Sequence, residues 1–143
     1  SCYYSMFQTC KKLPVAPKLP AVNLAKDCYM DMFTGCESLV EGPELPATVL
    51  APRCYFGMFY YCNNLEIAPD LLAPETESQC YFNMFWGCLK LRYVKCLATD
   101  ISADGATTDW INSSAAGTFV KKAGVDWPQG QRGIPANWSI IEE

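Results

Sequence analysis

The stretch Cys-Tyr-Met-Asp-Met-Phe-Thr-Gly-Cys at residues 28–36 contains a motif that occurs four times in the chain. Each copy starts with Cys-Tyr, has Met-Phe from the third residue after the Tyr, and ends with a second Cys three residues after the Phe. Self-similarity at a fixed period of this length is typical of proteins built from stacked coils. The copies are about 26 residues apart and begin at Cys2, Cys28, Cys54 and Cys80.

Each unit has one half without proline and one half in which proline recurs. At about 100° per residue, a helix over the proline-free half places the five signature residues of the second copy on one arc. We therefore predict a short amphipathic helix that is buried along that arc. The other half is predicted to form a short strand, as at residues 65–68 and 91–97, with proline ending it. The recurring residues of this half are Leu13, Leu39, Leu65 and Leu91, then Pro17, Pro43 and Pro69.

One strand and one helix per unit, with Leu at fixed offsets, resembles a coil of a leucine-rich repeat. The wording Met-Phe-x-Gly-Cys-x-x-Leu at residues 32–39, and Met-Phe-Trp-Gly-Cys at 84–88, is similar to the BspA-type repeats of bacterial surface proteins, especially those of gut Bacteroidetes. The resemblance covers residues 2 to about 97, and the first and third copies depart from it at Thr9 and Tyr61. It implies an α/β solenoid of leucine-rich-repeat coils, each of one short strand plus one short helix, with a C-terminal cap.

We expect one continuous domain with two parts. Residues 1–97 hold the four repeats, and residues 98–143 hold a degenerate fifth coil and the cap. In the fifth coil, Trp110-Ile111 stands in the Met-Phe slot and Ser114 in the second Cys slot. A last strand is predicted at residues 117–121, followed by two aromatic anchors, Trp127 and Trp138.

The sequence begins at Ser1, directly inside a repeat and without the polar cap that the open end of a solenoid needs, so we expect a fragment of a longer protein. The formal net charge is −4 and no Lys/Arg cluster occurs, which argues against nucleic-acid partners. No apolar run reaches membrane-spanning length, so we expect no membrane insertion. The chain has no histidine, the commonest general base and metal ligand. We find no catalytic constellation, and we expect neither an enzyme nor a cofactor.

Eight of the nine cysteines belong to the repeat, and three alternatives exist for them. In a helix the two cysteines of one unit lie about 12 Å apart, whereas a disulfide needs Cα atoms within about 7 Å. Bridges between coils remain open, but a ladder of reduced, buried thiols is favoured. A zinc site is disfavoured because neither a C-x-x-C spacing nor a histidine is present.

Cys96 is the ninth cysteine, and it falls in line with Lys18, Glu44 and Asp70 of the other copies. It is either a reactive thiol at an exposed position or a residue that the strand turns inward. Alternation from Val94 favours the inward orientation.

The outward positions of the predicted helices carry a dense group of aromatic residues in the third and fourth copies. Contiguous exposed apolar patches usually mark interaction sites, so this group is our candidate ligand-binding surface for a protein or a glycan. The alternative is packing between neighbouring coils, above all for the slot that holds Phe56 and Phe82. The strand side carries mixed charges in single slots, which is typical of a solvated face. The candidate residues are Phe56, Tyr60, Tyr61, Phe82 and Trp86.

The resemblance implies a non-catalytic binding or adhesion module of a secreted or cell-surface bacterial protein, which engages a host protein or glycan through the solenoid surface. Localisation outside the cell rests on the resemblance alone. The alternative is a structural stalk or assembly element of a larger surface or phage-fibre protein, in which the aromatic group mediates self-association.

Overall fold

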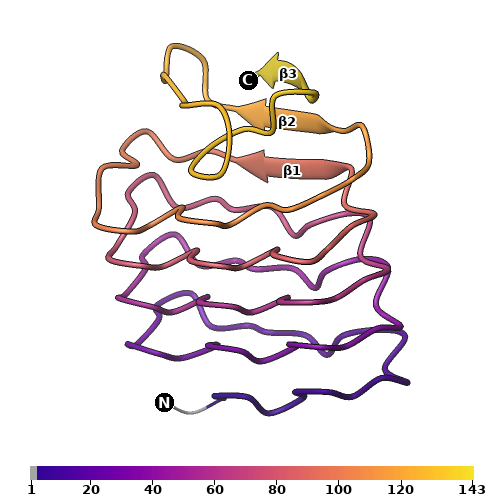
Figure 1. The fold of residues 1–143 in the computed structure, drawn as a ribbon. Coiled ribbons are helices and arrows are strands. Elements are labelled where there is room, and N and C mark those ends of the chain that lie inside the picture. Colours follow the sequence, from indigo (N-terminus) through magenta and orange to yellow (C-terminus); the bar gives the residue numbers. More distant parts are fainter. Residues whose placement is uncertain (1–2) are drawn as a thin grey trace.

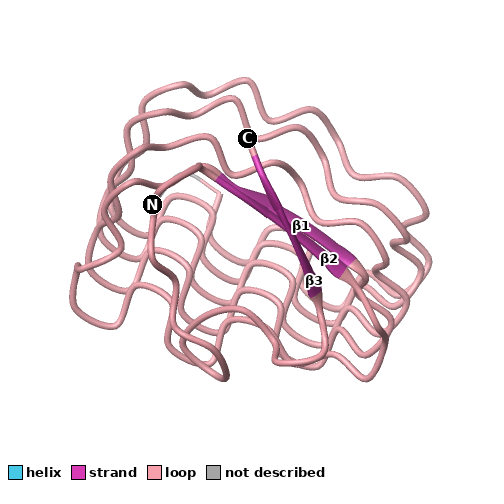
Figure 2. Cartoon of the chain, turned by 90° about the horizontal axis from the view of Figure 1, so that it is seen from above, coloured by secondary structure: helices cyan, strands magenta, loops and turns pink. Residues whose placement is uncertain are grey.

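The repeat units lie on top of one another as a stack of coils in the computed structural model, which describes residues 3–143 (Figure 1). Seen along the stack, successive coils follow similar paths (Figure 2). Ser1 and Cys2, and with them the first cysteine of the repeat, lie outside the described residues. We number the coils in chain order; they occupy residues 3–26, 27–52, 53–78 and 79–104, and the fifth begins at residue 105.

The predicted helices are wrong. Residues 3–143 contain no helix, and the proline-free half of each coil is a run of turns. Some amides bond three residues back, as Met32 N–H does to the Tyr29 carbonyl at 3.2 Å. The amides between them leave the coil: Phe33 N–H donates to the Met58 carbonyl of the next coil at 2.9 Å. A helix needs each N–H to bond four residues back within its own segment, so this alternation excludes one.

The expected fold class is therefore overturned. The chain is not an α/β solenoid of leucine-rich-repeat coils, because its coils contain turns in place of helices and its regular strands are three short parallel ones. We call residues 27–36 and their equivalents in the other coils the turn segments.

Positive backbone φ angles recur every fourth residue in the turn segments. In the second coil they occur at Asp27 (59°), Asp31 (54°) and Gly35 (71°). A type II turn requires such an angle at its third residue, and Gly, Asn and Asp adopt it most readily. The turn segments thus repeat every four residues. This period is close to the 3.6 residues of an α-helical turn, so the same apolar spacing also fits a helix. The equivalent residues in later coils include Gly57, Asn83, Gly87, Gly105 and Asp109.

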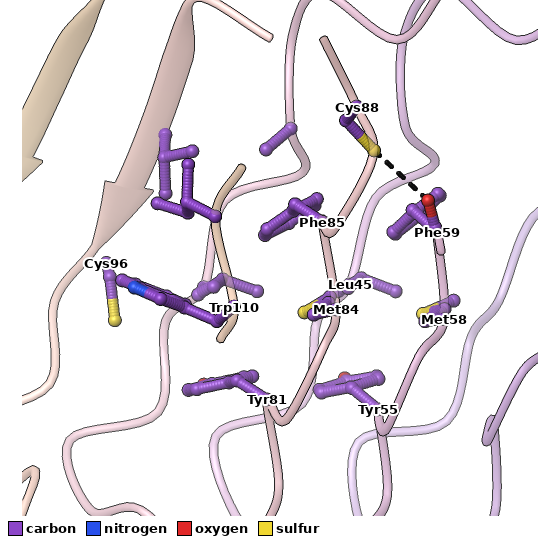
Figure 3. Close-up of a cluster of buried hydrophobic side chains, with 14 of the residues drawn as sticks. Leu45, Tyr55, Met58, Phe59, Tyr81, Met84, Phe85, Cys88, Cys96 and Trp110 are labelled. Atoms are coloured by element: carbon purple, nitrogen blue, oxygen red, sulfur yellow. Dashed lines mark hydrogen bonds between the residues drawn. The ribbon is translucent and has the colours of Figure 1, made fainter. Parts of the chain in front are cut away.

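The prediction that the signature side chains share one buried face is confirmed in the second, third and fourth coils. Equivalent rings stack from coil to coil, with Tyr55 and Tyr81 centroids 6.1 Å apart and Phe59 and Phe85 centroids 5.7 Å apart (Figure 3). The Cys88 thiol donates to the Phe59 carbonyl at 3.1 Å (Figure 3). The turn segments therefore bury the same residues that a helix face was expected to bury.

Three short strands form a parallel sheet in the order β1-β2-β3 at the C-terminal end of the stack (Figure 1). They are β1 (Tyr93–Cys96), β2 (Thr118–Lys121) and β3 (Ser139–Glu142). The strands predicted at 91–97 and 117–121 are confirmed in their central parts. The strand predicted at 65–68 is wrong, since Ile67 forms only isolated bridges there. Proline follows it at Pro69, which has no N–H to continue a ladder.

Cys96 is buried because the fourth coil is one residue shorter than the third at this point. Ile67 pairs with Tyr93, but Leu71 pairs with Cys96, so the spacing falls by one residue between the two bridges. A Pro-Asp pair precedes Leu71, whereas a single lysine precedes Cys96. The alignment of Cys96 with Asp70 is therefore wrong, and Cys96 takes the slot of a buried leucine. The inward orientation is confirmed, with Cys96 0% exposed.

The fifth coil and the segment after it cover the C-terminal end of the core. Trp110 is fully buried, its Nε1–H donates to the Gly133 carbonyl at 2.7 Å, and its ring stacks on Trp127 at 5.4 Å. Trp138 is buried against Gly117, where any Cβ would overlap the indole ring. Ser114, which was expected to fill a core slot, is exposed.

Truncating one core ring tests the stack. Phe59 is 0% exposed and lies between Phe33 and Phe85, with centroids 5.6 and 5.7 Å away. We expect Phe59→Ala to lower the free energy of unfolding in urea by about 3–5 kcal/mol. Leu89→Ala, at a side chain 47% exposed, should change it by no more than about 0.5 kcal/mol. Equal effects of the two variants would contradict the assignment of the buried face.

Candidate functional site

The five candidate residues lie on the outer side of the third and fourth turn segments. We call Phe56, Tyr60, Tyr61, Phe82 and Trp86 the aromatic patch. Their side chains lie outside the core because the turn segments alternate between residue pairs directed inward and residue pairs directed outward. Within the third coil, Tyr55 and Phe59 are buried, whereas Phe56 and Tyr60 are half-buried and Tyr61 is exposed.

Phe56 and Phe82 stack on each other. Their ring centroids are 4.8 Å apart and their planes differ by 10°. Both side chains are half-buried, so packing between coils covers part of each ring and leaves the rest accessible. The two alternatives for this slot, packing and exposure, therefore both hold in part.

Tyr61 is the most exposed member of the patch, at 48%. Its φ angle is 56°, and the equivalent position is glycine in the second and fourth coils, Gly35 and Gly87. A bulky residue with this backbone conformation is strained by on the order of 1 kcal/mol. The ring lies against Gly87, where an added Cβ would come within 2.7 Å of it. The fourth coil thus provides room for an aromatic ring that the third coil holds in a strained conformation.

Tyr60 packs its ring edge-to-face with Tyr61, with centroids 4.5 Å apart. Loss of hydration raises the pKa of the Tyr60 hydroxyl, and the neighbouring Tyr61 and Asp31 add to the effect. Tyr60 and Trp86, which were predicted at outward positions, are both half-buried. The Tyr61 N–H donates to the Trp86 carbonyl at 2.7 Å, which ties the backbones of the two coils together beneath the patch.

Trp86 also borders a hollow of about 180 Å³ between the fourth coil, the fifth coil and the cap. Asn112, Gln131 and Pro135 are among the residues that line it. This side of the patch therefore combines an indole ring with two side-chain amides.

Asp31 lies at the edge of the aromatic patch and was not among the binding residues predicted from the sequence. Its Oδ1 rests against Gly57, where a Cβ would collide with it. The Thr34 hydroxyl shares its one proton between this oxygen, at 3.4 Å, and the Gly57 carbonyl, at 2.8 Å. Partial burial raises the pKa of the Asp31 carboxyl, and the Thr34 hydrogen bond acts in the opposite direction. The available signal was the slot that holds Asp31, Gly57 and Asn83 at one-repeat intervals, which are residues that favour positive φ.

The opposite side of the coils has an open groove of about 370 Å³, lined by residues that include Glu41, Pro43, Glu44, Pro69 and Asp70. Its three carboxylates are exposed. Residues 3–143 contain no group of three or more His, Cys, Asp or Glu side chains that could hold a metal ion.

Most cysteines of the described chain are buried thiols rather than reactive groups, and Cys10 is exposed. The free and buried thiols include Cys36, Cys54, Cys62, Cys80, Cys88 and Cys96. Burial raises the pKa of Cys54, Cys62, Cys80 and Cys96 to about 12. Since the thiolate is the reactive form, these side chains remain neutral and inert near neutral pH.

No family model, curated protein or solved structure matches the chain. The described part of the chain also has no helix that could cross a bilayer. The resemblance to BspA-type surface proteins stays a prediction, and its leucine-rich-repeat fold is excluded by the turn segments.

Thiol labelling tests the contrast between Cys10 and the core. Cys10 is exposed, whereas Cys96 is 0% exposed and has a pKa of about 12. In a Cys2→Ser variant, iodoacetamide at pH 8 should alkylate Cys10 and leave Cys96 unmodified, as read by mass spectrometry of the digested chain. Cys96 should react only after unfolding in concentrated guanidinium chloride. Labelling of Cys96 in the folded chain at a rate similar to that of Cys10 would contradict its burial.

Proposed function

We propose that the chain is a non-catalytic binding module that engages a partner outside the cell through the aromatic patch. Two adjacent coils place five aromatic side chains on their outer side, with Phe56 stacked on Phe82 and Tyr60 packed against Tyr61. Tyr and Trp are frequent anchors at protein interfaces. The coils beneath hold the patch in place through backbone hydrogen bonds such as that from Tyr61 N–H to the Trp86 carbonyl.

The observation that carries this proposal is the conformation of Tyr61. Its strained φ of 56° and its 48% exposure place an aromatic ring at the surface at a cost in stability. The positive φ belongs to the repeat, since Thr9 has a φ of 60° at the same slot of the first coil, but Gly35 and Gly87 show that the fold does not need a side chain there. Strain that the fold does not require is often found at binding sites.

Replacing the strained residue tests the patch. Tyr61→Gly introduces the residue of the second and fourth coils, so we expect the melting temperature to be kept or raised. Screening the wild-type chain on arrays of extracellular proteins and glycans identifies binders. For these, both Tyr61→Gly and Trp86→Ala should lower the affinity by roughly tenfold or more.

Val22→Ala is the matched control for this experiment. Val22 is 55% exposed, lies in the first coil, and takes no part in the patch. Its substitution should leave the affinity unchanged. If the wild-type chain binds an array component and both patch variants bind it equally well, the patch is not the binding surface.

A second candidate function is assembly into a larger structure, in which the aromatic patch would mediate self-association. The stacked rings of Phe56 and Phe82 are only half-buried, and Tyr61 is 48% exposed, so both could pack against a second copy.

Light scattering distinguishes assembly from binding as a monomer. If the aromatic patch mediates assembly, the wild-type chain should be a stable oligomer and Trp86→Ala should convert it to a monomer. An oligomer that Trp86→Ala leaves intact would contradict a role of the patch in self-association. A monomeric wild-type chain at high concentration contradicts the assembly function.

A further inference from the structure

Two aspartates of the second coil are displayed in the same way from successive turns. Asp27 and Asp31 are four residues apart and have φ angles of 59° and 54°. The carboxylate of Asp27 accepts two hydrogen bonds from Arg53 of the next coil, at 2.8 and 2.9 Å. A carboxylate at this kind of turn is thus presented in a geometry that a guanidinium can bind with two parallel N–H groups.

Asp31 has no such partner within the part of the chain that the structure describes. Gly57 stands one repeat after it, where Arg53 stands one repeat after Asp27. Among residues 3–143, no Lys or Arg forms an ion pair with Asp31. The Thr34 hydroxyl lies 3.4 Å from the Asp31 carboxylate and shares its single proton with the Gly57 carbonyl, which is nearer at 2.8 Å. A half-buried carboxylate is therefore left with one long hydrogen bond and no counter-charge.

The surroundings of this carboxylate favour an organic cation. A Cβ built on Gly57 would collide with Asp31 Oδ1 and lie 3.9 Å from the Tyr60 Cβ, so the carboxylate and the base of the Tyr60 side chain flank the same glycine. Phe56 is adjacent, since its carbonyl accepts the Asp31 N–H at 2.8 Å. Aromatic faces attract cations, and a guanidinium also stacks on them.

We propose that Asp31 and Tyr60 form a binding site for an arginine side chain of a partner protein. In this arrangement the guanidinium donates two N–H groups to the Asp31 carboxylate, as Arg53 does to Asp27, and packs against Tyr60. The inference rests on the proposed function and makes it more specific, because it identifies the partner of the aromatic patch as a protein and arginine as the side chain that anchors it.

Two other features agree with this assignment. The formal net charge of −4 favours the approach of a basic partner surface. Arginine is enriched at protein interfaces, and its guanidinium stacks on aromatic faces. A neutral glycan could also hydrogen-bond to the carboxylate, but it would leave the negative charge without a counter-charge.

A pair of small probes tests the site on the full chain. N-acetylarginine amide carries a guanidinium, and N-acetylcitrulline amide has nearly the same shape but no charge. In NMR titrations that follow the Asp31 carboxyl carbon and the Tyr60 ring, the arginine probe should bind wild type roughly fivefold or more tightly than the citrulline probe.

Asp31→Asn should abolish this preference. Asparagine is compatible with the backbone there, since Asn83 holds the same slot of the fourth coil at a φ of 53°. The matched control is Asp70→Asn, which removes one exposed carboxylate from the opposite groove and should keep the preference. Equal affinity of the two probes for wild type, or an unchanged preference in Asp31→Asn, overturns the inference.

The ligands identified on the arrays distinguish a failure of this inference from a failure of the proposed function. A protein ligand whose affinity falls with both Tyr61→Gly and Asp31→Asn supports both. A neutral glycan ligand that depends on Tyr61 but not on Asp31 keeps the proposed function and overturns the arginine site. An arginine preference at Asp31 without any dependence of array binding on Tyr61 or Trp86 keeps the site and overturns the role of the patch.

Discussion

Hydrogen bonds between the backbones of successive turn segments hold the stack together, and the other features of the molecule follow from them. Because alternate N–H groups bond to the following coil, as Asp31 does to the Phe56 carbonyl at 2.8 Å, equivalent residues come into register. Tyr stacks on Tyr and Phe on Phe with ring centroids 5.6–6.1 Å apart between the second and fourth coils. One backbone pattern thus sets both the core and the surface.

The same pattern separates residues that stabilise the fold from residues that are free to vary. Signature side chains face inward, where each one packs against the equivalent side chains of the coils before and after it. Outward positions face solvent, and there Tyr61 and Asp31 occur next to glycines of the following coil, Gly87 and Gly57. In both cases the glycine has no side chain, which leaves space at the surface for the Tyr61 ring or the Asp31 carboxylate. The aromatic patch and the unpaired carboxylate therefore arise from local exceptions to the repeat.

Part of the fold and of the candidate site was predictable from the sequence, and there are physical reasons why the rest was not. The positions of the buried residues followed from their spacing, but that spacing of four fits a helix and a run of turns almost equally well. Positive φ angles at Asp27, Asp31 and Gly35 decide between them, and the recurrence of Asp, Asn and Gly at these positions was the only sign of it. The register of Cys96 was not predictable, because one missing residue before it changes which slot it fills.

The sequence by itself determined that the chain is a stack of like units, which side chains form its core, and which positions outside the core carry aromatic residues. These follow from periodicity, since residues at equal intervals must share an environment when units stack. Only the tertiary structure decided the backbone conformation of each unit, because each amide N–H can donate either to a carbonyl of its own coil or to one of the next coil. It alone also showed that Asp31 lacks the counter-charge that Asp27 has, since that depends on which residue the next coil places opposite each carboxylate.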